Sequence, residues 1–159
     1  MARITTNTTG TQPVIHIGLV GANLANSSVS IALPFVQDVT VTNSTGVYSY
    51  ITFSDVDTRK LSTPADNEIS TNVVIDNEAY FGNVTATANT AAALGVASVS
   101  INKQTVDFKI YLNGVGANAY FYSGTGFLTN LAPTVSPDAP VWVTPLTIAV
   151  DGPLTVGKV

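Results

Sequence analysis

The feature that most constrains the fold is one helix-forming run. Elsewhere in the chain, apolar and polar residues alternate as they do in β-strands. Thr90 is a suitable N-cap for residues 91–98, where three consecutive alanines and Leu94 favour an α-helix. Gly95 and Val96 weaken this helix, and about two to three turns are not stable alone in water. The sequence therefore predicts a short helix that is held by packing against a sheet.

Alternating apolar residues predict strands along most of the remaining chain. The clearest is at residues 105–112, where Val106, Phe108 and Ile110 share one face. The other strands are predicted at residues 14–20, 28–33, 37–42, 47–53, 68–76, 79–86, 119–123, 127–131 and 141–150. Pro145 indicates that the last of these is an edge strand or contains a bulge, because proline cannot donate to a ladder.

The connections between the early strands are also predicted. Residues 43–46 have turn chemistry, which would join 37–42 and 47–53 into a β-hairpin. Residues 54–67 show almost no periodicity and contain Pro64, so they are predicted to form a long loop. Connections longer than about 12 residues are uncommon in compact domains and usually serve binding or assembly.

The length of 159 residues predicts one domain covering residues 1–159. Residues 1–12 are polar and are expected to be a flexible N-terminal arm. The predicted elements together give an all-β fold class. We expect a β-sandwich or barrel-forming sheets, with one short flanking α-helix and a long inter-strand loop.

The low charge of the chain limits its partners. Charged residues make up 10% of the sequence, against about 25% in an ordinary soluble domain. Such a surface gives little protection against association, so contact with further copies of the same chain is expected. The net charge is -4, and the six Lys and Arg residues are dispersed along the sequence. This distribution excludes electrostatic binding of nucleic acid, which requires clustered cations.

No catalytic, cofactor or metal site is predicted. The absence of cysteine excludes disulfides and thiolate ligands. His16 is the only histidine and lies in an alternating strand, which favours a surface or interface role over that of a general base. The pair Asp55 and Asp57 lacks the pattern of a calcium loop. Since neither a secretory signal nor a stretch of about 20 apolar residues is present, export and membrane insertion are not expected.

Six of the ten acidic residues lie close together in the sequence. They are Asp55, Asp57, Asp66, Glu68, Asp76 and Glu78. Two interpretations stay open: a solvated loop and polar strand face, or an acidic surface that faces an anionic polymer without binding it. Charge repulsion is screened within about 8 to 10 Å, so the second interpretation requires a narrow gap.

Residues 90–157 resemble the C-terminal half of the major tail tube protein of long-tailed bacteriophages. The matching features are the small-residue helix, the connector Asn102-Lys103-Gln104, the strand at 105–112, Asn113-Gly114, Gly126-Phe127-Leu128, the Ser136-Pro137-Asp138 loop, and a last strand of type Val-x-Val-x-x-Leu-Thr-Ile that closes at Asp151-Gly152. Their order and turn chemistry carry the resemblance.

This resemblance implies a structural virion protein without enzymatic activity. Its subunits would form hexameric rings in which strands of neighbours join into a barrel, and the rings would stack into a tail tube, a conduit for DNA ejection. The implied partners are further copies of the chain, a tape measure protein and passing DNA in the lumen without tight binding, and tail terminator and tail tip proteins. Assembly would take place in the cytoplasm of the host bacterium.

The resemblance also implies roles for particular residues. The predicted long loop would reach a neighbouring subunit or ring, with Asp55, Asp57, Arg59, Lys60 and Leu61 as contact candidates. The candidates for an acidic lumen are Asp66, Glu68, Asp76 and Glu78.

Two alternative functions stay open at this point. A capsid decoration or fibre subunit would form trimers. A carbohydrate-binding module would stack sugars on exposed aromatic rings. Its candidate platforms are Tyr48, Tyr50, Tyr120, Tyr122 and Trp142.

Overall fold

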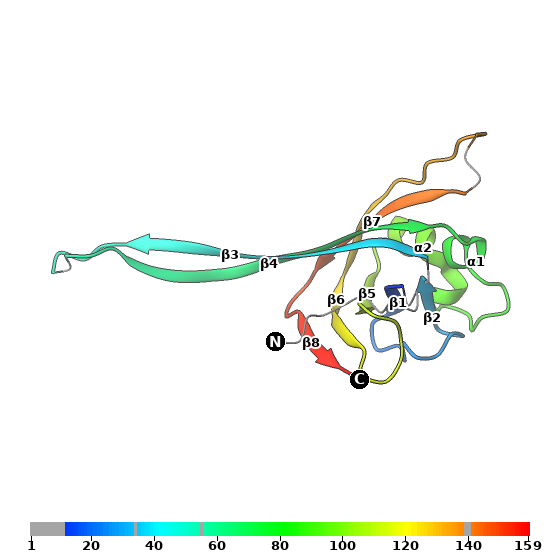
Figure 1. Ribbon diagram of the computed structural model, residues 1–159, viewed down its shortest axis with the longest axis horizontal. Coiled ribbons are helices and arrows are strands. Elements are labelled where there is room, and N and C mark those ends of the chain that lie inside the picture. The colour runs from blue at the N-terminus through cyan, green and yellow to red at the C-terminus, as the bar shows by residue number, and fades with distance from the viewer. Residues whose placement is uncertain (1–11, 34, 55, 139–140) are drawn as a thin grey trace.

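The computed structural model describes residues 12–33, 35–54, 56–138 and 141–159. Within these residues, eight antiparallel strands form one sheet in the order β2-β1-β5-β6-β7-β4-β3, with β8 paired to β6. The strands are β1 (Val14–Leu19), β2 (Ser30–Leu33), β3 (Val36–Tyr50), β4 (Arg59–Val74), β5 (Thr105–Tyr111), β6 (Tyr120–Leu131), β7 (Val143–Val150) and β8 (Thr155–Lys158). Two helices in this part of the chain, α1 (Asn77–Phe81) and α2 (Ala91–Ile101), flank the sheet at one end (Figure 1). The predicted all-β fold class is confirmed.

The sheet curls, because its two outermost strands are neighbours in the sequence. Only two positions separate Leu33 at the end of β2 from Val36 at the start of β3, a link that reaches at most about 11 Å. In a flat sheet the same strands would lie about 29 Å apart, at about 4.8 Å per strand spacing. The strands therefore bend round a common core, as the barrel-forming prediction requires.

The core lies between the inner face of the sheet and α2. In β5, Val106, Phe108 and Ile110 are fully buried, and the register places Ile15 opposite Ile110 and Ile17 opposite Phe108. The helix α2 packs against β1, β2 and β6. The strand predicted at residues 105–112 is thus confirmed, with its apolar face inward.

The helix α2 begins where the sequence predicts and extends three residues further. The Thr90 hydroxyl accepts a hydrogen bond from the Ala93 N–H at 3.4 Å. Gly95 breaks the helix with φ 73° and ψ 162°, so the predicted weak point is a kink. At this kink the backbone meets α1: a Cβ on Gly95 would overlap the backbone nitrogen of Gly82 and lie 2.6 Å from the carbonyl carbon of Phe81.

The strand predicted at residues 79–86 is wrong, because α1 and a turn occupy this segment. The Asn83 side-chain oxygen accepts hydrogen bonds from the N–H of Thr85 at 2.9 Å and from its hydroxyl at 2.7 Å. Local side-chain bonds of this kind offer the backbone an alternative to a ladder. The described chain therefore has a second short helix besides the one expected.

The hairpin predicted at residues 37–53 is also wrong. Residues 43–46 lie inside β3, which pairs with β4 from Val36 opposite Val73 to Tyr50 opposite Arg59. The chain reverses instead between the two strands, at residues 51–58. The predicted long loop is consequently wrong for residues 59–67, which belong to β4.

Pro64 does not break β4, because it lies at a β-bulge. Between the pairs Thr45–Ala65 and Val47–Ser62, β4 contributes one residue more than β3. A bulge leaves a residue without a ladder bond, which suits proline. Pro64 is thus compatible with the strand that the sequence did not predict.

The C-terminal strands differ from prediction in three respects. The two segments predicted at 119–123 and 127–131 form one strand, β6, and β8 was not predicted. The strand β7 pairs with both β4 and β6, so it is not an edge strand. Its ladder with β6 nevertheless ends at Leu146, the residue that follows Pro145, so the proline has no partner in β6 and is tolerated on that side.

Candidate assembly surface

The distal part of the β3–β4 hairpin projects from the body of the molecule as a two-stranded ribbon (Figure 1). The strand β4 pairs with β7 from Glu68 to Val74, whereas residues 59–67 pair with β3 alone. At about 3.3 Å per residue, residues 59–67 extend roughly 30 Å beyond the sheet. We call residues 43–67, with the turn at their centre, the arm.

The arm lacks the neighbouring strands that normally stabilise a sheet. Where the structure describes the arm, neither strand edge is paired with a third strand. A two-stranded ribbon is marginally stable at best in water, and open edges are sites for pairing with another chain. The arm is therefore built to be completed by a partner.

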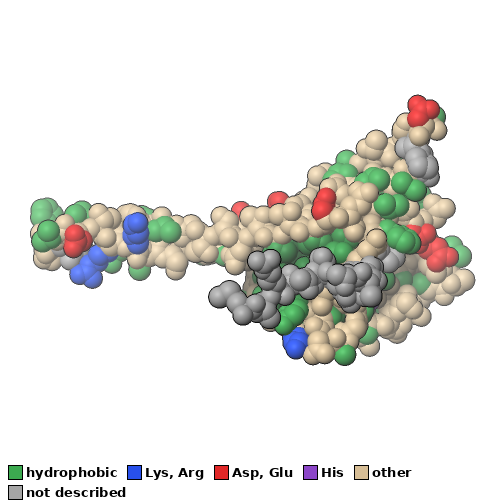
Figure 2. Space-filling view, in the orientation of Figure 1, with side chains coloured by type: hydrophobic (Ala, Val, Ile, Leu, Met, Phe, Trp, Pro, Cys, Tyr) green, Lys and Arg blue, Asp and Glu red, His purple; other side chains and the backbone are tan. Residues whose placement is uncertain are grey.

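Large apolar side chains at the end of the arm are exposed, and Figure 2 shows them beside charged groups. They are Val47, Tyr48, Ile51, Phe53, Val56 and Leu61, each more than half exposed. Phe53 is fully exposed. Large exposed apolar side chains gathered at one end of a molecule indicate an interaction site.

The register divides these residues between two faces of the arm. Tyr48 lies opposite Leu61 and Tyr50 opposite Arg59, so these four side chains share one face, which we call the aromatic face. The two tyrosine rings stack, with centroids 6.2 Å apart and planes at 19°. Tyrosine and arginine are the residues that most often dominate protein–protein binding energy.

A clasp between β3 and β4 lies in the body, five residues before the arm begins at residue 43. The register shifts between Val36 and Asp38, which marks a bulge at Gln37. The Asp38 carboxylate accepts hydrogen bonds from the backbone N–H of Asn72 at 3.0 Å and from its side-chain amide at 2.8 Å, and the Asp38 carbonyl accepts one from the Thr71 hydroxyl. Because a bulge bends its strand, this clasp sets the direction in which the arm leaves the body.

The structure places most of the predicted contact candidates together. Asp57 lies in the turn, and Arg59, Lys60 and Leu61 are the first residues of β4, at the end of the arm. Asp55 lies outside the described residues. The candidates are thus on an extended hairpin rather than on the loop that the sequence predicts.

The candidates for an acidic lumen are spread out. Asp66 and Glu68 lie in β4 near the root of the arm, opposite Ser44 and Thr42. Asp76 and Glu78 lie at the other end of β4, at the start of α1. Since β4 is extended, acids that are close in the sequence do not form one patch.

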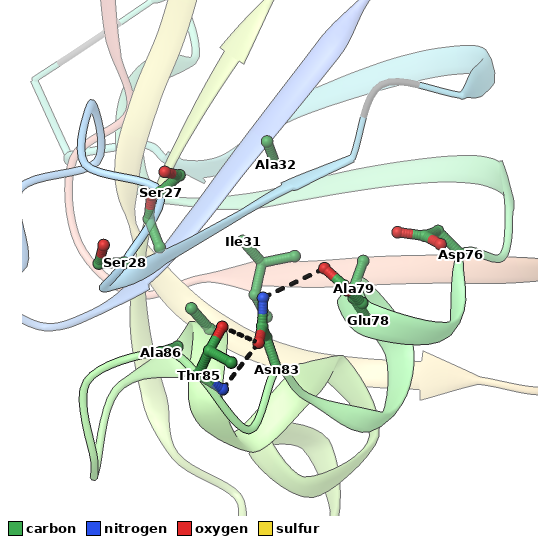
Figure 3. Close-up of a pocket in the computed structure, with 12 residues that line it drawn as sticks. Ser27, Ser28, Ile31, Ala32, Asp76, Glu78, Ala79, Asn83, Thr85 and Ala86 are labelled. Carbon is green, nitrogen blue, oxygen red and sulfur yellow. Dashed lines mark hydrogen bonds between the residues drawn. The ribbon is translucent and has the colours of Figure 1, made fainter.

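Asp76 and Glu78 line a polar cavity of about 400 Å³ between β2, α1 and α2 (Figure 3). The Glu78 carboxylate accepts a hydrogen bond from the Asn83 side-chain amide at 3.1 Å. The Asn83 side-chain oxygen accepts two hydrogen bonds from Thr85, so the polar groups of Glu78, Asn83 and Thr85 are hydrogen-bonded among themselves. Within the described ranges, no group of three or more His, Cys, Asp or Glu residues could hold a metal ion.

The candidate sugar platforms do not form one site. Tyr48 and Tyr50 lie on the arm, Tyr120 and Tyr122 on β6, and Trp142 precedes β7. The sequence did not reveal the aromatic face, because Leu61 and Arg59 join the tyrosines only through the pairing of β3 with β4. None of the helices in the described part of the chain has the length and hydropathy of a membrane span.

No protein-family profile and no curated protein sequence matches this chain. Solved structures do match. A chain in the tail of an empty gene transfer agent particle, computed with helical refinement and C6 symmetry, is 11% identical with a TM-score of 0.63, over 93% of this chain and 97% of that chain. A chain in the virion of the native gene transfer agent particle is 12% identical with a TM-score of 0.60, at the same coverage.

A third similar chain comes from the six-fold symmetrised baseplate of the anti-feeding prophage. It is 8% identical with a TM-score of 0.54, over 97% of both chains. At this coverage the likeness extends beyond residues 90–157 to most of the preceding chain, for which the sequence offered a pattern of strands and a long loop. The resemblance to tail tube proteins inferred from residues 90–157 is confirmed as a likeness of fold, and that likeness covers nearly the whole chain.

Proposed function

We propose that this chain is a structural subunit that assembles with its own copies into stacked hexameric rings, forming a tail tube through which DNA is ejected. The arm is the observation that carries this proposal. It is a long ribbon with open edges and exposed apolar side chains, and it gains a core only from a partner. The six-fold symmetry of the similar tail and baseplate structures supports a ring of six.

The energetics of the arm favour a cooperative polymer over isolated pairs. Fully burying a large apolar side chain contributes about 1.5 to 3 kcal/mol, so burying the exposed fractions of Val47, Ile51, Phe53 and Leu61 contributes about 4 to 8 kcal/mol. Association costs about 4 to 15 kcal/mol. The gain from one arm contact therefore matches only the lower part of this cost, and stable assembly calls for contacts within the ring as well.

The edges of the sheet supply those ring contacts. In the described chain, β2 and β3 are the outermost strands of the sheet order, and β3 is 15 residues long. An unpaired edge of this length is a liability for a monomer. Pairing between neighbouring copies would satisfy these edges, and the low charge of the surface would then favour assembly.

Within such a tube, Asp66, Glu68, Asp76 and Glu78 are our candidates for acidic groups that face the lumen. Proteins bind DNA largely because their Lys and Arg side chains displace the counterions of the phosphates. Carboxylates cannot displace these counterions. DNA and a tape measure protein would then pass without adhering. The further partners in this proposal are the tail terminator and tail tip proteins, and the chain itself has no catalytic role.

Electron microscopy of the purified protein at high concentration tests the proposal. Hollow tubes with six-fold symmetry are expected. Protein that remains monomeric, even when tail extract is added as a seed, contradicts the proposal. Trimers would contradict it as well and would favour a capsid decoration or fibre subunit.

A further inference from the structure

We infer that the aromatic face of the arm binds an apolar row at the opposite end of the same ribbon in a second copy of the chain. This inference rests on the proposed function and names the surface that receives the arm. The apolar row consists of Phe35, Val74, Val141 and Val143. Phe35 and Val141 are about half exposed, and Val74 and Val143 are partly exposed.

The row lies on the face of the sheet that points away from the core. Val73 and Thr144 pair with each other and are buried, so their neighbours Val74 and Val143, which also pair, point to the other face. The Phe35 carbonyl accepts a hydrogen bond from the Val74 N–H at 3.0 Å. Phe35, which directly precedes β3, therefore lies beside Val74 at the end of β4. The row thus crosses the ends of three adjacent strands.

The row is a local exception on this face of β4. The preceding residues on the same face are Glu68, Ser70 and Asn72, all polar. Apolar side chains begin only at Val74, where β4 ends. A change from polar to apolar at the end of an otherwise polar face indicates a contact surface.

The arm cannot reach the row of its own chain. Leu61 and Val74 lie in one continuous strand and are about 43 Å apart, at about 3.3 Å per residue. Pairing with β3 follows this segment on both sides of the bulge at Pro64, so the folded arm points away from the row. Contact between the aromatic face and the apolar row must therefore join different copies.

Charge at the two ends of β4 suits this contact. Arg59 and Lys60 are the first two residues of the strand, whereas Asp76 and Glu78 follow its end at the start of α1. A head-to-tail arrangement brings these cations near these carboxylates, which leaves Asp66 and Glu68 as the candidates for the acidic lumen. Asp57 lies in the turn, beyond the aromatic face.

The contact is heterologous, because it joins two different surfaces. Each added copy then presents one further arm and one further row, so copies add until a ring closes or an open helical array forms. A contact between identical surfaces would stop at two copies. The geometry thus accounts for a repeating assembly with one type of arm contact.

Cysteine cross-linking tests this inference directly, because the chain contains no cysteine of its own. The test variant carries Leu61→Cys and Val141→Cys, and the matched control carries Ser62→Cys and Val141→Cys. Ser62 is adjacent to Leu61 but lies on the other face of the arm, opposite Val47. The assembled protein is treated with a short thiol cross-linker and run on a denaturing gel. The test variant should give a series of covalent products larger than the dimer, and the control should not give them.

The outcomes separate the inference from the proposed function. If the test variant assembles into tubes but cross-links no better than the control, the docking surface is wrong and the proposed function stands. A product that stops at the dimer overturns the head-to-tail arrangement. If wild-type protein does not assemble, the proposed function fails.

A second measurement covers the case in which the double variant does not assemble. Leu61→Cys and Val141→Cys are then made as separate chains and added as a minor fraction to wild-type protein. Cross-linked pairs that require both variants are expected in the assembled material. Their absence from tubes that contain both variants overturns the inference.

Discussion

Replacing Gly95 with alanine should destabilise the fold strongly. Gly95 has φ 73° and ψ 162°, a region that is essentially restricted to glycine, which costs another residue about 1 to 3 kcal/mol. The new Cβ would also overlap the backbone nitrogen of Gly82, and overpacking of this kind costs about 1 to 3 kcal/mol. The sum, about 2 to 6 kcal/mol, is a large part of the roughly 5 to 15 kcal/mol that stabilises a typical domain.

Urea unfolding of dilute protein, followed by circular dichroism, measures this effect as a lower midpoint at unchanged slope. The matched control is Gly116→Ala, because Gly116 has open space where a Cβ would be added. We expect the free energy of unfolding of the control to change by less than about 0.5 kcal/mol. If Gly95→Ala lowers the free energy of unfolding no more than the control does, the close approach of the α2 backbone to the end of α1 at this glycine is wrong.

Three further changes test other parts of the structure. Asp107→Ala removes hydrogen bonds of 2.7 and 2.9 Å to the Gly21 N–H and the Thr125 hydroxyl, and should lower the free energy of unfolding by about 1 to 3 kcal/mol in the same assay. Asp38→Ala releases the clasp at the start of β3; circular dichroism should stay native while tube yield falls, and an unchanged yield would refute the role of the clasp. Reversing Asp55 and Asp57 to lysine should impair assembly or slow DNA passage, and normal particle yield and infectivity would exclude a role for these acids.

The sequence predicted best where one face of an element is buried. Alternation at Val106, Phe108 and Ile110 reflects a core on one side and water on the other, and β5 appears as predicted. The N-cap Thr90 likewise marked the start of α2, because capping is a local interaction. Both signals depend only on neighbours in the chain.

The arm could not be predicted in this way. Both of its faces are exposed, so residues 59–67 carry no alternation, and residues 43–46 look like a turn although they lie within β3. Pairing of Tyr48 with Leu61 joins segments on either side of the turn, and no local pattern reveals it. The sequence therefore predicted a loop where the structure has a paired hairpin, and the contact role of Asp57, Arg59, Lys60 and Leu61 stays a prediction.

The central claim is that the arm is completed only by another copy of the chain, and hydrogen exchange of its backbone amides tests this claim most directly. Amides at residues 43–50 and 59–67 should exchange rapidly in dilute monomer, while those of β5 remain protected, and the arm should become protected in assembled tubes. Arm amides that are already as protected as β5 in the dilute monomer would contradict the account.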